Sequence, residues 1–263
     1  MNLLRSIYHS LRDTAIITRR NLMRYIRLPR LLFFSSIQPV MFLLLFNYVF
    51  GGALGGVTRA AGGKYIDYLL PGILVQMVMF GGVQTGIGLA DDMSRGIVDR
   101  FRSLPMSRLA VVAGRSFADA VRNVVVVLIM IAVGYLVGFR FHAGLADAVG
   151  MVAVAVLFGY ALSWAFAIIG MAVHDSETAQ LASFVFIFPL TFASAAFIPV
   201  QTMPSWLQVF VRNQPVTFVA NSARHLALGT PDGGATWKIL LWCLCLLIIF
   251  IPFAVRLYKH VTS

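Results

Sequence analysis

The chain has 263 residues, of which 59% are hydrophobic and only 12% are charged, and its formal net charge is +11. A soluble domain carries about 25% charged residues, so this composition excludes a water-soluble globular protein and indicates an integral membrane protein. The positive charge does not indicate nucleic-acid binding, because the cations flank apolar segments instead of forming a patch on a soluble surface. A basic bias beside membrane spans is typical of membrane topology and of attraction to anionic lipid.

Residues 1–30 predict an amphipathic helix that lies along the cytoplasmic membrane surface. Leu4, Tyr8 and Leu11 recur at helical spacing, arginines supply the opposite side, and Pro29 breaks the pattern. We expect the apolar side to face lipid and the arginines to lie near lipid phosphates.

Apolar stretches follow one another along the rest of the chain, and each is long enough for a hydrocarbon layer of ~30 Å. Their limits are 31–50, 66–89, 115–139, 147–173, 179–198 and 237–256. These six spans predict an all-α integral membrane fold and a single transmembrane domain over residues 1–263. Within 199–236 we expect short helices on the external side, one in Pro204–Phe210 and one over Pro215–Leu228.

Several side chains inside the spans are candidates for a substrate path. They are polar or aromatic groups in otherwise oily segments: Gln38, Asn47, Gln76, Gln84, Phe188, Thr191 and Phe192. A flat apolar surface with a few polar groups suits an apolar cationic or aromatic substrate. For each residue, ordinary packing or hydrogen bonding between helices is the alternative interpretation. Gly82 and Gly86 have GxxxG spacing, which predicts close contact between two helix backbones.

Segment 90–108 interrupts the apolar pattern with a dense run of charge. A charge at the centre of a bilayer costs ~2.5–3.5 kcal/mol, so this segment must lie in water or against a partner protein. Ile97 and Phe101 share a helix face, and we expect Asp91 and Asp92 at the N-terminal end of a short helix, where the helix dipole favours anions. The segment therefore predicts an amphipathic helix that either lies on the membrane surface or docks into a groove of a cytoplasmic protein.

The distribution of Lys and Arg predicts the orientation of the chain. One side of the membrane receives the N-terminal arginines together with Arg95, Arg100, Arg102, Arg108, Arg115, Arg256 and Lys259. The other side receives fewer cations, namely Arg59, Lys64, Arg140, Arg212 and Arg224. We therefore expect both termini and the charged segment in the cytoplasm. At the edge of the third span, Asp119 is spaced to pair with Arg115 or Arg122.

The sequence offers no energy source of its own. The G-x-x-x-x-G-K-[ST] signature of a phosphate-binding loop is missing, and in its nearest approach Gly63-Lys64 is followed by Tyr65. The histidines have no metal-binding spacing, and no chain of acidic residues crosses the spans as a proton relay would. We expect no catalytic residue, no metal site and no cofactor in this chain, so active transport would need a partner that hydrolyses ATP.

Stretches along nearly the whole chain resemble one family of transporters. They are Arg19-Arg20-Asn21-Leu22, Pro39-Val40-Met41-Phe42, Tyr68-Leu69-Leu70-Pro71-Gly72-Ile73, the run from Gly96 to Arg108, Pro204-Ser205-Trp206-Leu207 and Asn213-Gln214-Pro215-Val216. The chain is similar to the membrane subunit of ABC-2 type (type V-like) exporters, and within these to the daunorubicin/doxorubicin-resistance permeases of actinobacteria. It departs from the family at the start of the charged segment, where Asp91-Asp92-Met93 replaces a Glu-Arg-Glu pattern.

The resemblance implies an ATP-driven exporter of a hydrophobic drug, antibiotic or lipid-like compound in the plasma membrane. Segment 90–108 would hold a coupling helix docked in a cleft of a separate cytoplasmic ATP-binding subunit, and the N-terminal helix would be an interfacial connecting helix. ATP and Mg²⁺ would be bound by that subunit, and a second permease protomer, the same or different, would complete the complex. The candidate coupling residues are Asp92, Arg95, Gly96, Asp99, Arg100, Phe101 and Arg102, with Phe101 as the apolar anchor.

Two other functions remain open at the level of sequence. One is the export of a polyprenyl-linked glycan by a permease of the same superfamily. The other is a membrane scaffold or immunity protein that binds a toxic compound without transporting it. The scaffold hypothesis predicts no ATPase subunit and a dispensable charged segment.

Overall fold

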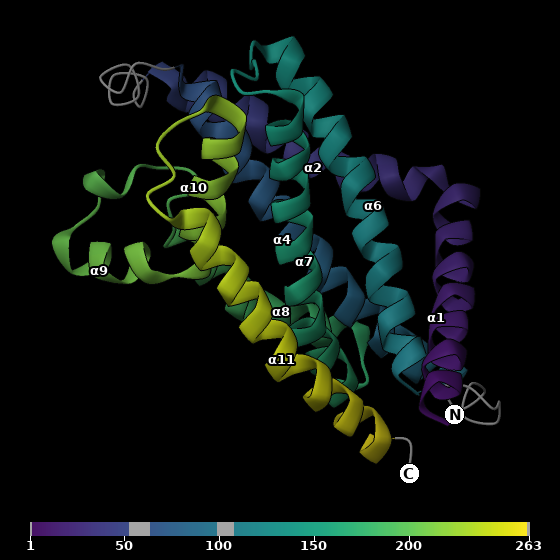
Figure 1. The fold of residues 1–263 in the computed structure, drawn as a ribbon. Coiled ribbons are helices and arrows are strands. Elements are labelled where there is room, and N and C mark those ends of the chain that lie inside the picture. The colour runs from purple at the N-terminus through teal and green to yellow at the C-terminus, as the bar shows by residue number, and fades with distance from the viewer. Residues whose placement is uncertain (1, 53–63, 99–107, 262–263) are drawn as a thin grey trace.

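The computed structural model of the chain describes residues 2–52, 64–98 and 108–261, and the regular elements within these ranges are helices (Figure 1). In chain order they are α1 (Asn2–Arg27), α2 (Pro29–Leu45), the π-helical η1 (Phe46–Phe50), α4 (Tyr65–Ser94), α6 (Arg108–Val137), α7 (Leu145–Val173), α8 (Ser176–Phe192), the 3₁₀ turn η2 (Val200–Thr202), α9 (Ser205–Asn213), α10 (Pro215–Leu228) and α11 (Ala235–Val261).

Five helical stretches among the described residues are long and apolar enough to cross a membrane. They are Leu32–Val49, Tyr65–Ser94, Ala110–Val137, Leu145–Val173 and Ala235–Tyr258. The predicted span 179–198 corresponds to α8, which has 17 residues and ends at Phe192. Beyond the end of α8, the carbonyl oxygens of Ala195 and Ala196 accept from Arg224 of α10. The all-α membrane fold is thus present, and the arrangement of six spans stays a prediction.

Helices α4 and α7 form the centre of the bundle (Figure 1). Their backbones approach closely, because a Cβ atom at Gly86 would overlap the backbone of Phe166, and one at Gly170 would overlap Gly86. A Cβ at Gly82 would lie 3.2 Å from the carbonyl oxygen of Gly159. The predicted contact face of Gly82 and Gly86 is therefore the surface on which α4 meets α7.

Helix α1 packs along α6 at one edge of the bundle (Figure 1). Ile17 is buried in this contact, next to Gly114 of α6, and the hydroxyl of Thr18 donates to the carbonyl oxygen of Gly114 at 3.1 Å. Leu11 and Ile26 remain exposed. The amphipathic helix thus divides its apolar side chains between α6 and the surroundings, and its place along the membrane surface stays a prediction.

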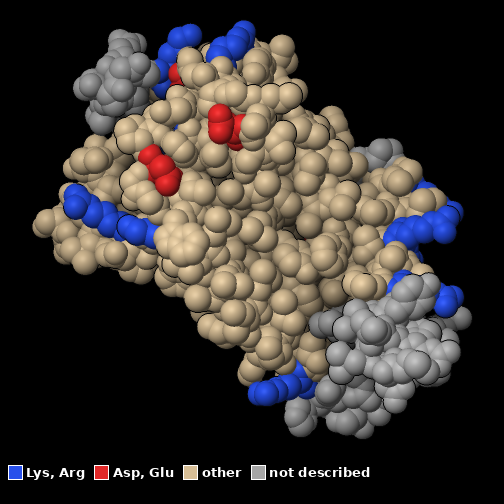
Figure 2. Space-filling model, viewed as in Figure 1, with Lys and Arg blue, Asp and Glu red and all other residues tan. Residues whose placement is uncertain are grey.

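The surface of the protein has the pattern of a membrane protein. Figure 2 shows charged side chains toward the ends and edges of the molecule and a broad uncharged region between them. Helix α2 contributes large exposed apolar side chains to the surface, among them Phe33, Phe34 and Met41. Figure 1 shows that α1 begins and α11 ends at the same end of the bundle.

Helix α10 packs its apolar face into the bundle, against α4, α7 and α11. Pro215 occupies the first helical turn, and Gly229 ends the helix with a φ of +71°, a conformation that glycine adopts without a Cβ penalty. Val216 and Val219 are fully buried. The first and last residues predicted for this helix therefore agree with the structure, whereas its location on the external side of the membrane stays a prediction.

Arg224 fastens α10 to two other parts of the chain. Its Nη2 donates to the carbonyl oxygens of Ala195 and Ala196 at 2.7 and 2.8 Å, and its Nε donates to that of Tyr68 at 3.0 Å. The guanidinium carbon also lies 3.5 Å from the centroid of the Tyr68 ring. Because Ala195 and Ala196 follow the end of α8, Arg224 supplies donors that a continuing helix would have provided.

Candidate functional site

Helix α4 continues beyond the predicted span, so it carries Asp91 and Asp92 in its last turn. Our expectation of these carboxylates at the N-terminal end of a separate helix is wrong. The C-terminal end of a helix disfavours anions, so both need cationic partners in this position. Asp92 is only 7% exposed and lies inside the bundle. Asp92 therefore connects helices in this structure, and its role in coupling to an ATPase stays a prediction.

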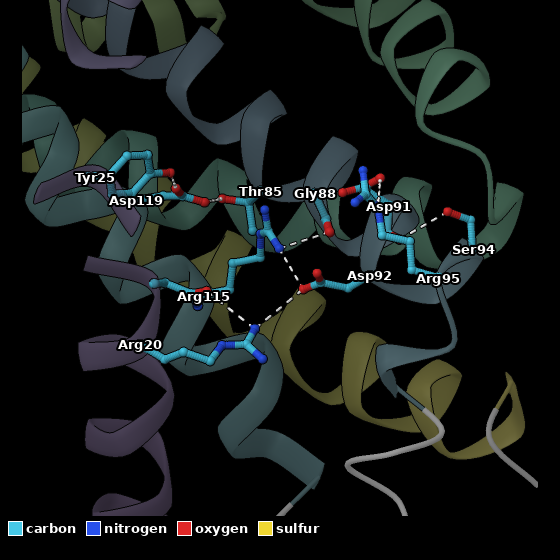
Figure 3. Close-up of polar contacts among 11 residues, drawn as sticks. Arg20, Tyr25, Thr85, Gly88, Asp91, Asp92, Ser94, Arg95, Arg115 and Asp119 are labelled. Carbon is cyan, nitrogen blue, oxygen red and sulfur yellow. Dashed lines mark hydrogen bonds and ion pairs between the residues drawn. The ribbon is translucent and has the colours of Figure 1, made fainter. Parts of the chain in front are cut away.

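Two arginines from other helices hold Asp92 (Figure 3). Its Oδ2 lies 2.7 Å from Nη1 of Arg115 on α6 and 3.7 Å from Nη2 of Arg20 on α1. The same Arg115 nitrogen donates to the carbonyl oxygen of Gly88 at 2.8 Å. Burial lowers the pKa of Arg20, and the charge of Asp92 opposes that shift. Arg20, Asp92 and Arg115, here called the charged junction, thus join α1, α4 and α6.

The chain leaves α4 through an exposed turn that carries two of the predicted coupling residues. The Nε of Arg95 lies 2.8 Å from Oδ1 of Asp91, and both side chains are at the surface (Figure 3). Gly96 follows with a φ of +67° in the left-handed region. Val98 is buried again, in the apolar cluster that α6, α7 and α11 share with the end of α4. The other predicted coupling residues, Asp99, Arg100, Phe101 and Arg102, lie outside the described residues.

A hydrogen-bonded chain next to the charged junction also crosses from α1 to α4. The hydroxyl of Tyr25 donates to Oδ1 of Asp119 at 2.6 Å, and the hydroxyl of Thr85 donates to Oδ2 at 2.7 Å (Figure 3). Asp119 thus binds hydroxyl groups, where the sequence spacing had suggested an arginine partner. Burial, and then the charge of Asp119, raise the pKa of Tyr25 to about 12.

A cavity of about 520 Å³ adjoins the charged junction. Residues of α1, α2, α4, α6 and α8 line it, including Arg115, Asp119 and Asp91. Three predicted path residues, Gln38, Gln76 and Gln84, also line the cavity. The cavity thus places Gln38 of α2 in the same lining as Gln76 and Gln84 of α4. This volume is in the range of sites for small molecules.

The other predicted path residues lie away from the cavity lining. Phe188 and Phe192 are exposed on α8, and Asn47 is half-buried in η1. Thr191 is buried, and its hydroxyl has no hydrogen-bond partner among the described residues.

A row of aromatic rings extends from the cavity wall along α8 to η1. Phe80 and Phe184 line the cavity, and both rings contact Phe188, at centroid distances of 6.1 and 5.3 Å. The contacts continue to Phe192 at 6.0 Å and from there to Phe197 at 5.6 Å. The ring of Phe197 then stacks on Phe46 of η1 at 5.0 Å. Here this set is called the aromatic row.

The sequence analysis missed several residues of the cavity lining and of the aromatic row. It singled out Phe188 and Phe192 but not Phe80 and Phe184, because an aromatic ring in an apolar span carries no positional signal of its own. The spacing of 184, 188 and 192 is the signal that could have found the α8 part of the row, since residues four apart share a helix face.

Comparison with known proteins relates the whole arrangement to one transporter family. The family model described as ABC-2 type transporter matches residues 12–228. The daunorubicin resistance ABC transporter permease protein DrrB1 of Streptomyces coeruleorubidus is 34% identical over 92% of this chain and 84% of its own length. The doxorubicin resistance ABC transporter permease protein DrrB of Mycobacterium tuberculosis (strain ATCC 25618 / H37Rv) is 30% identical over 81% of this chain and 73% of its own length. This chain belongs to the ABC-2 type transporter family.

Proposed function

We propose that the chain is the membrane-spanning permease subunit of an ATP-binding cassette exporter. It would move a hydrophobic drug, antibiotic or lipid-like compound out of the cell with ATP hydrolysed by a separate subunit. The family match over residues 12–228 carries this proposal. The printed names of the relatives, which refer to daunorubicin and doxorubicin resistance, direct it toward drug-like substrates.

The segment that follows α4 is the proposed contact with the ATP-binding subunit, which would itself bind ATP and Mg²⁺. Arg95 is exposed at the beginning of this segment, and Phe101 would be its apolar anchor. Because Asp92 ties α4 to both α1 and α6, a force on the segment would move three helices together. Such rigid-body motion of packed helices is a common form of conformational coupling.

The cavity and the aromatic row together form the proposed substrate path. Both are built largely from α2, α4 and α8, which correspond to the predicted spans one, two and five. A second protomer, identical or related, would face this side and complete the path. Both termini would lie in the cytoplasm of a cell whose plasma membrane holds the complex, and the common end of α1 and α11 supports this arrangement.

Co-purification with an ATPase tests the proposal. The tagged chain is expressed in a host together with a candidate ATP-binding subunit, and the purified complex is assayed for ATP hydrolysis with and without daunorubicin. We expect a P-loop ATPase in the complex and faster hydrolysis when the drug is present. A chain that purifies without any ATPase, and whose charged segment can be scrambled without loss of protection against the drug, would instead be a scaffold or immunity protein.

The role of Phe101 is tested in the same complex. Phe101→Asp should leave the permease inserted in the membrane but abolish the stimulation of ATP hydrolysis, because a buried anchor would become charged. Phe210→Asp is the matched control, since Phe210 is exposed on α9. Unchanged stimulation in Phe101→Asp would contradict the docking role.

A further inference from the structure

The cavity has two chemically different walls. Phe42, Phe80 and Phe184 give it an apolar side. The charged side has an excess of positive charge, because it carries three arginines and two aspartates: Arg24, Arg115, Arg122, Asp91 and Asp119. A volume of about 520 Å³ is far larger than one ion needs and fits a small organic molecule. A ligand of this cavity must therefore be complementary to both an apolar and a charged surface.

Arg122 is the most buried of the three arginines that line this cavity. It is 8% exposed, and its Nη2 donates only to the carbonyl oxygen of Gly81 at 3.3 Å and to Oδ1 of Asn123 at 3.2 Å. Its guanidinium carbon lies 5.7 Å from the centre of the Tyr25 ring. Among the described residues, Arg122 has no ion pair within 4.0 Å, and its Nε has no hydrogen-bond partner. A buried charge without a counter-charge is costly.

Two further residues of the cavity lining carry donor atoms without a partner among the described residues. The atoms are Nδ2 of Asn21 and Nε of Arg115, and both are buried. The carboxylates in the neighbourhood are already engaged. Asp92 binds Arg115, and Asp119 accepts from the hydroxyls of Tyr25 and Thr85. Among the described residues of the cavity lining, the buried side-chain atoms without a hydrogen-bond partner are therefore all donors.

We propose that this cavity binds an amphiphile with an anionic head, whose carboxylate or phosphate oxygens accept from Arg122. The apolar body of the amphiphile lies against Phe80 and Phe184 and continues along the aromatic row. A guanidinium recognises such oxygens through strong charge-assisted hydrogen bonds. The inference rests on the proposed export function, because it treats the cavity as the substrate site of the permease. An exported acid and an anionic membrane lipid share this chemistry.

Competition binding tests the proposal on the full chain in nanodiscs of zwitterionic phosphatidylcholine. Radiolabelled decanoate is the probe, and unlabelled decanoate, decanol, decylammonium and inorganic phosphate are the competitors. We expect decanoate to compete at least about tenfold better than decanol, as the loss of one charge-assisted hydrogen bond would predict. Decylammonium and inorganic phosphate should compete poorly, because the first lacks the anion and the second lacks the apolar body.

Equal competition by decanoate and decanol would overturn the proposal, and so would competition by phosphate alone at the same concentration as decanoate. A further set of competitors separates the two sources of the ligand. Displacement of the probe by phosphatidic acid at lower concentrations than by decanoate would identify a membrane lipid, and the reverse order would identify a free acid. Either result supports the shared head-group chemistry.

Variants locate the site. Arg122→Gln should weaken decanoate binding by at least about tenfold and leave decanol binding unchanged. Gln84→Glu is a second variant in case the first does not fold, since Gln84 lines the cavity but is exposed. Its added carboxylate should also weaken decanoate binding by electrostatic repulsion. Arg256→Gln is the matched control, because Arg256 is an exposed residue of α11. Full decanoate affinity in both cavity variants would refute the assignment.

The outcomes separate this inference from the proposed function. If daunorubicin stimulates the ATPase while decanoate fails to bind, the exporter function stands and the anion site fails. If decanoate binds through Arg122 but no compound stimulates an ATPase, the site stands and the exporter function fails.

Discussion

Two buried arginines at different places in the bundle are stabilised in different ways. Arg115 on α6 is neutralised by the carboxylate of Asp92 at 2.7 Å, and Arg20 of α1 shares that carboxylate. Arg224 on α10 binds only the carbonyl oxygens of Tyr68, Ala195 and Ala196, apart from an amide of its own helix. Side chains can exchange partners without a change in the backbone, whereas backbone carbonyls cannot move without their helices.

This difference indicates different mechanical roles. The ionic contacts of the charged junction are made by side chains, and only Arg115 also binds a backbone carbonyl, that of Gly88. Helices α1, α4 and α6 can therefore shift relative to one another more readily than the parts that Arg224 joins. Arg224 fixes the break after α8 and the beginning of α4 to α10, and any motion there would leave buried carbonyl groups without donors. We therefore expect the junction to be adaptable and the Arg224 contact to be rigid.

The largest expected effect is that of Arg224→Met. The change removes every donor to Ala195 and Ala196 from that side chain, so it should lower the free energy of unfolding by on the order of 3 kcal/mol or more. Arg224→Lys should recover little, because one ammonium group cannot reproduce the planar set of donors. Thermal unfolding of the detergent-purified chain measures the effect, with Arg212→Met on exposed α9 as the control. If Arg224→Met were as stable as the wild type, the carbonyl contacts of Arg224 would not stabilise the bundle, and the proposed contrast with the charged junction would be wrong.

The charged junction should respond to paired changes. Arg115→Met leaves Asp92 buried with Arg20 alone at 3.7 Å, and we expect a loss of stability of about 2 kcal/mol. Asp92→Asn in the same chain should restore part of this loss, because the uncompensated carboxylate is then gone. A double-mutant cycle by thermal unfolding gives the coupling energy, for which we expect about 0.5–3 kcal/mol. Strict additivity would mean that the ion pair contributes nothing.

A smaller effect concerns pH. The pKa of Tyr25 is raised to about 12 from a usual value of 10.0, so the folded state favours the neutral phenol. Its contribution to stability is complete below pH 10 and is lost as the pH rises from 10 to about 12. Hydrogen exchange of α1 should therefore accelerate in this range relative to the exchange of α11. Tyr25→Phe should exchange faster at neutral pH and lack this dependence; the same pH profile in both chains would refute the role of the hydroxyl.

The smallest expected effect comes from the carboxylate next to Asp92. Asp91 pairs with Arg95 at 2.8 Å, but both side chains are at the surface, where an ion pair is screened by water. Asp91→Ala should change the free energy of unfolding by less than about 0.5 kcal/mol. Thermal unfolding of Asp91→Ala and Asp92→Ala under the same conditions compares the exposed and the buried carboxylate directly. Equal losses of stability in the two variants would show that burial does not determine the effect.

The membrane character and several helix limits of this protein could be predicted from sequence. The expected span 31–50 agrees with the apolar stretch Leu32–Val49, and the expected helix Pro215–Leu228 agrees with α10. Both predictions depend on local rules, namely the length of an apolar stretch and the positions of proline and glycine. The limits of α8 could not be predicted in this way, because the carbonyls after Phe192 have their donor on α10.

The candidate site, like the fold, was predictable from sequence only in part. Of the polar side chains predicted for a substrate path, Gln38, Gln76 and Gln84 line the cavity, whereas Asn47 and Thr191 do not. Their role in a substrate path stays a prediction. The end of α4 was not predictable, because two aspartates in a last turn are unfavourable in isolation. They become acceptable only when Arg115, far along the chain on α6, is folded against Asp92.

The sequence by itself determined that this protein lies in a membrane, which stretches are helical, and that charge is gathered beside one of them. Each of these follows from interactions within a few residues or with the solvent. Only the tertiary structure decided that Asp92 is internal, that Arg224 is held by carbonyl groups, and that Arg122 lines a cavity with no ion pair within 4.0 Å among the described residues. The physical reason is that the energy of a buried charge depends on its partners in space, and those partners come from distant parts of the chain.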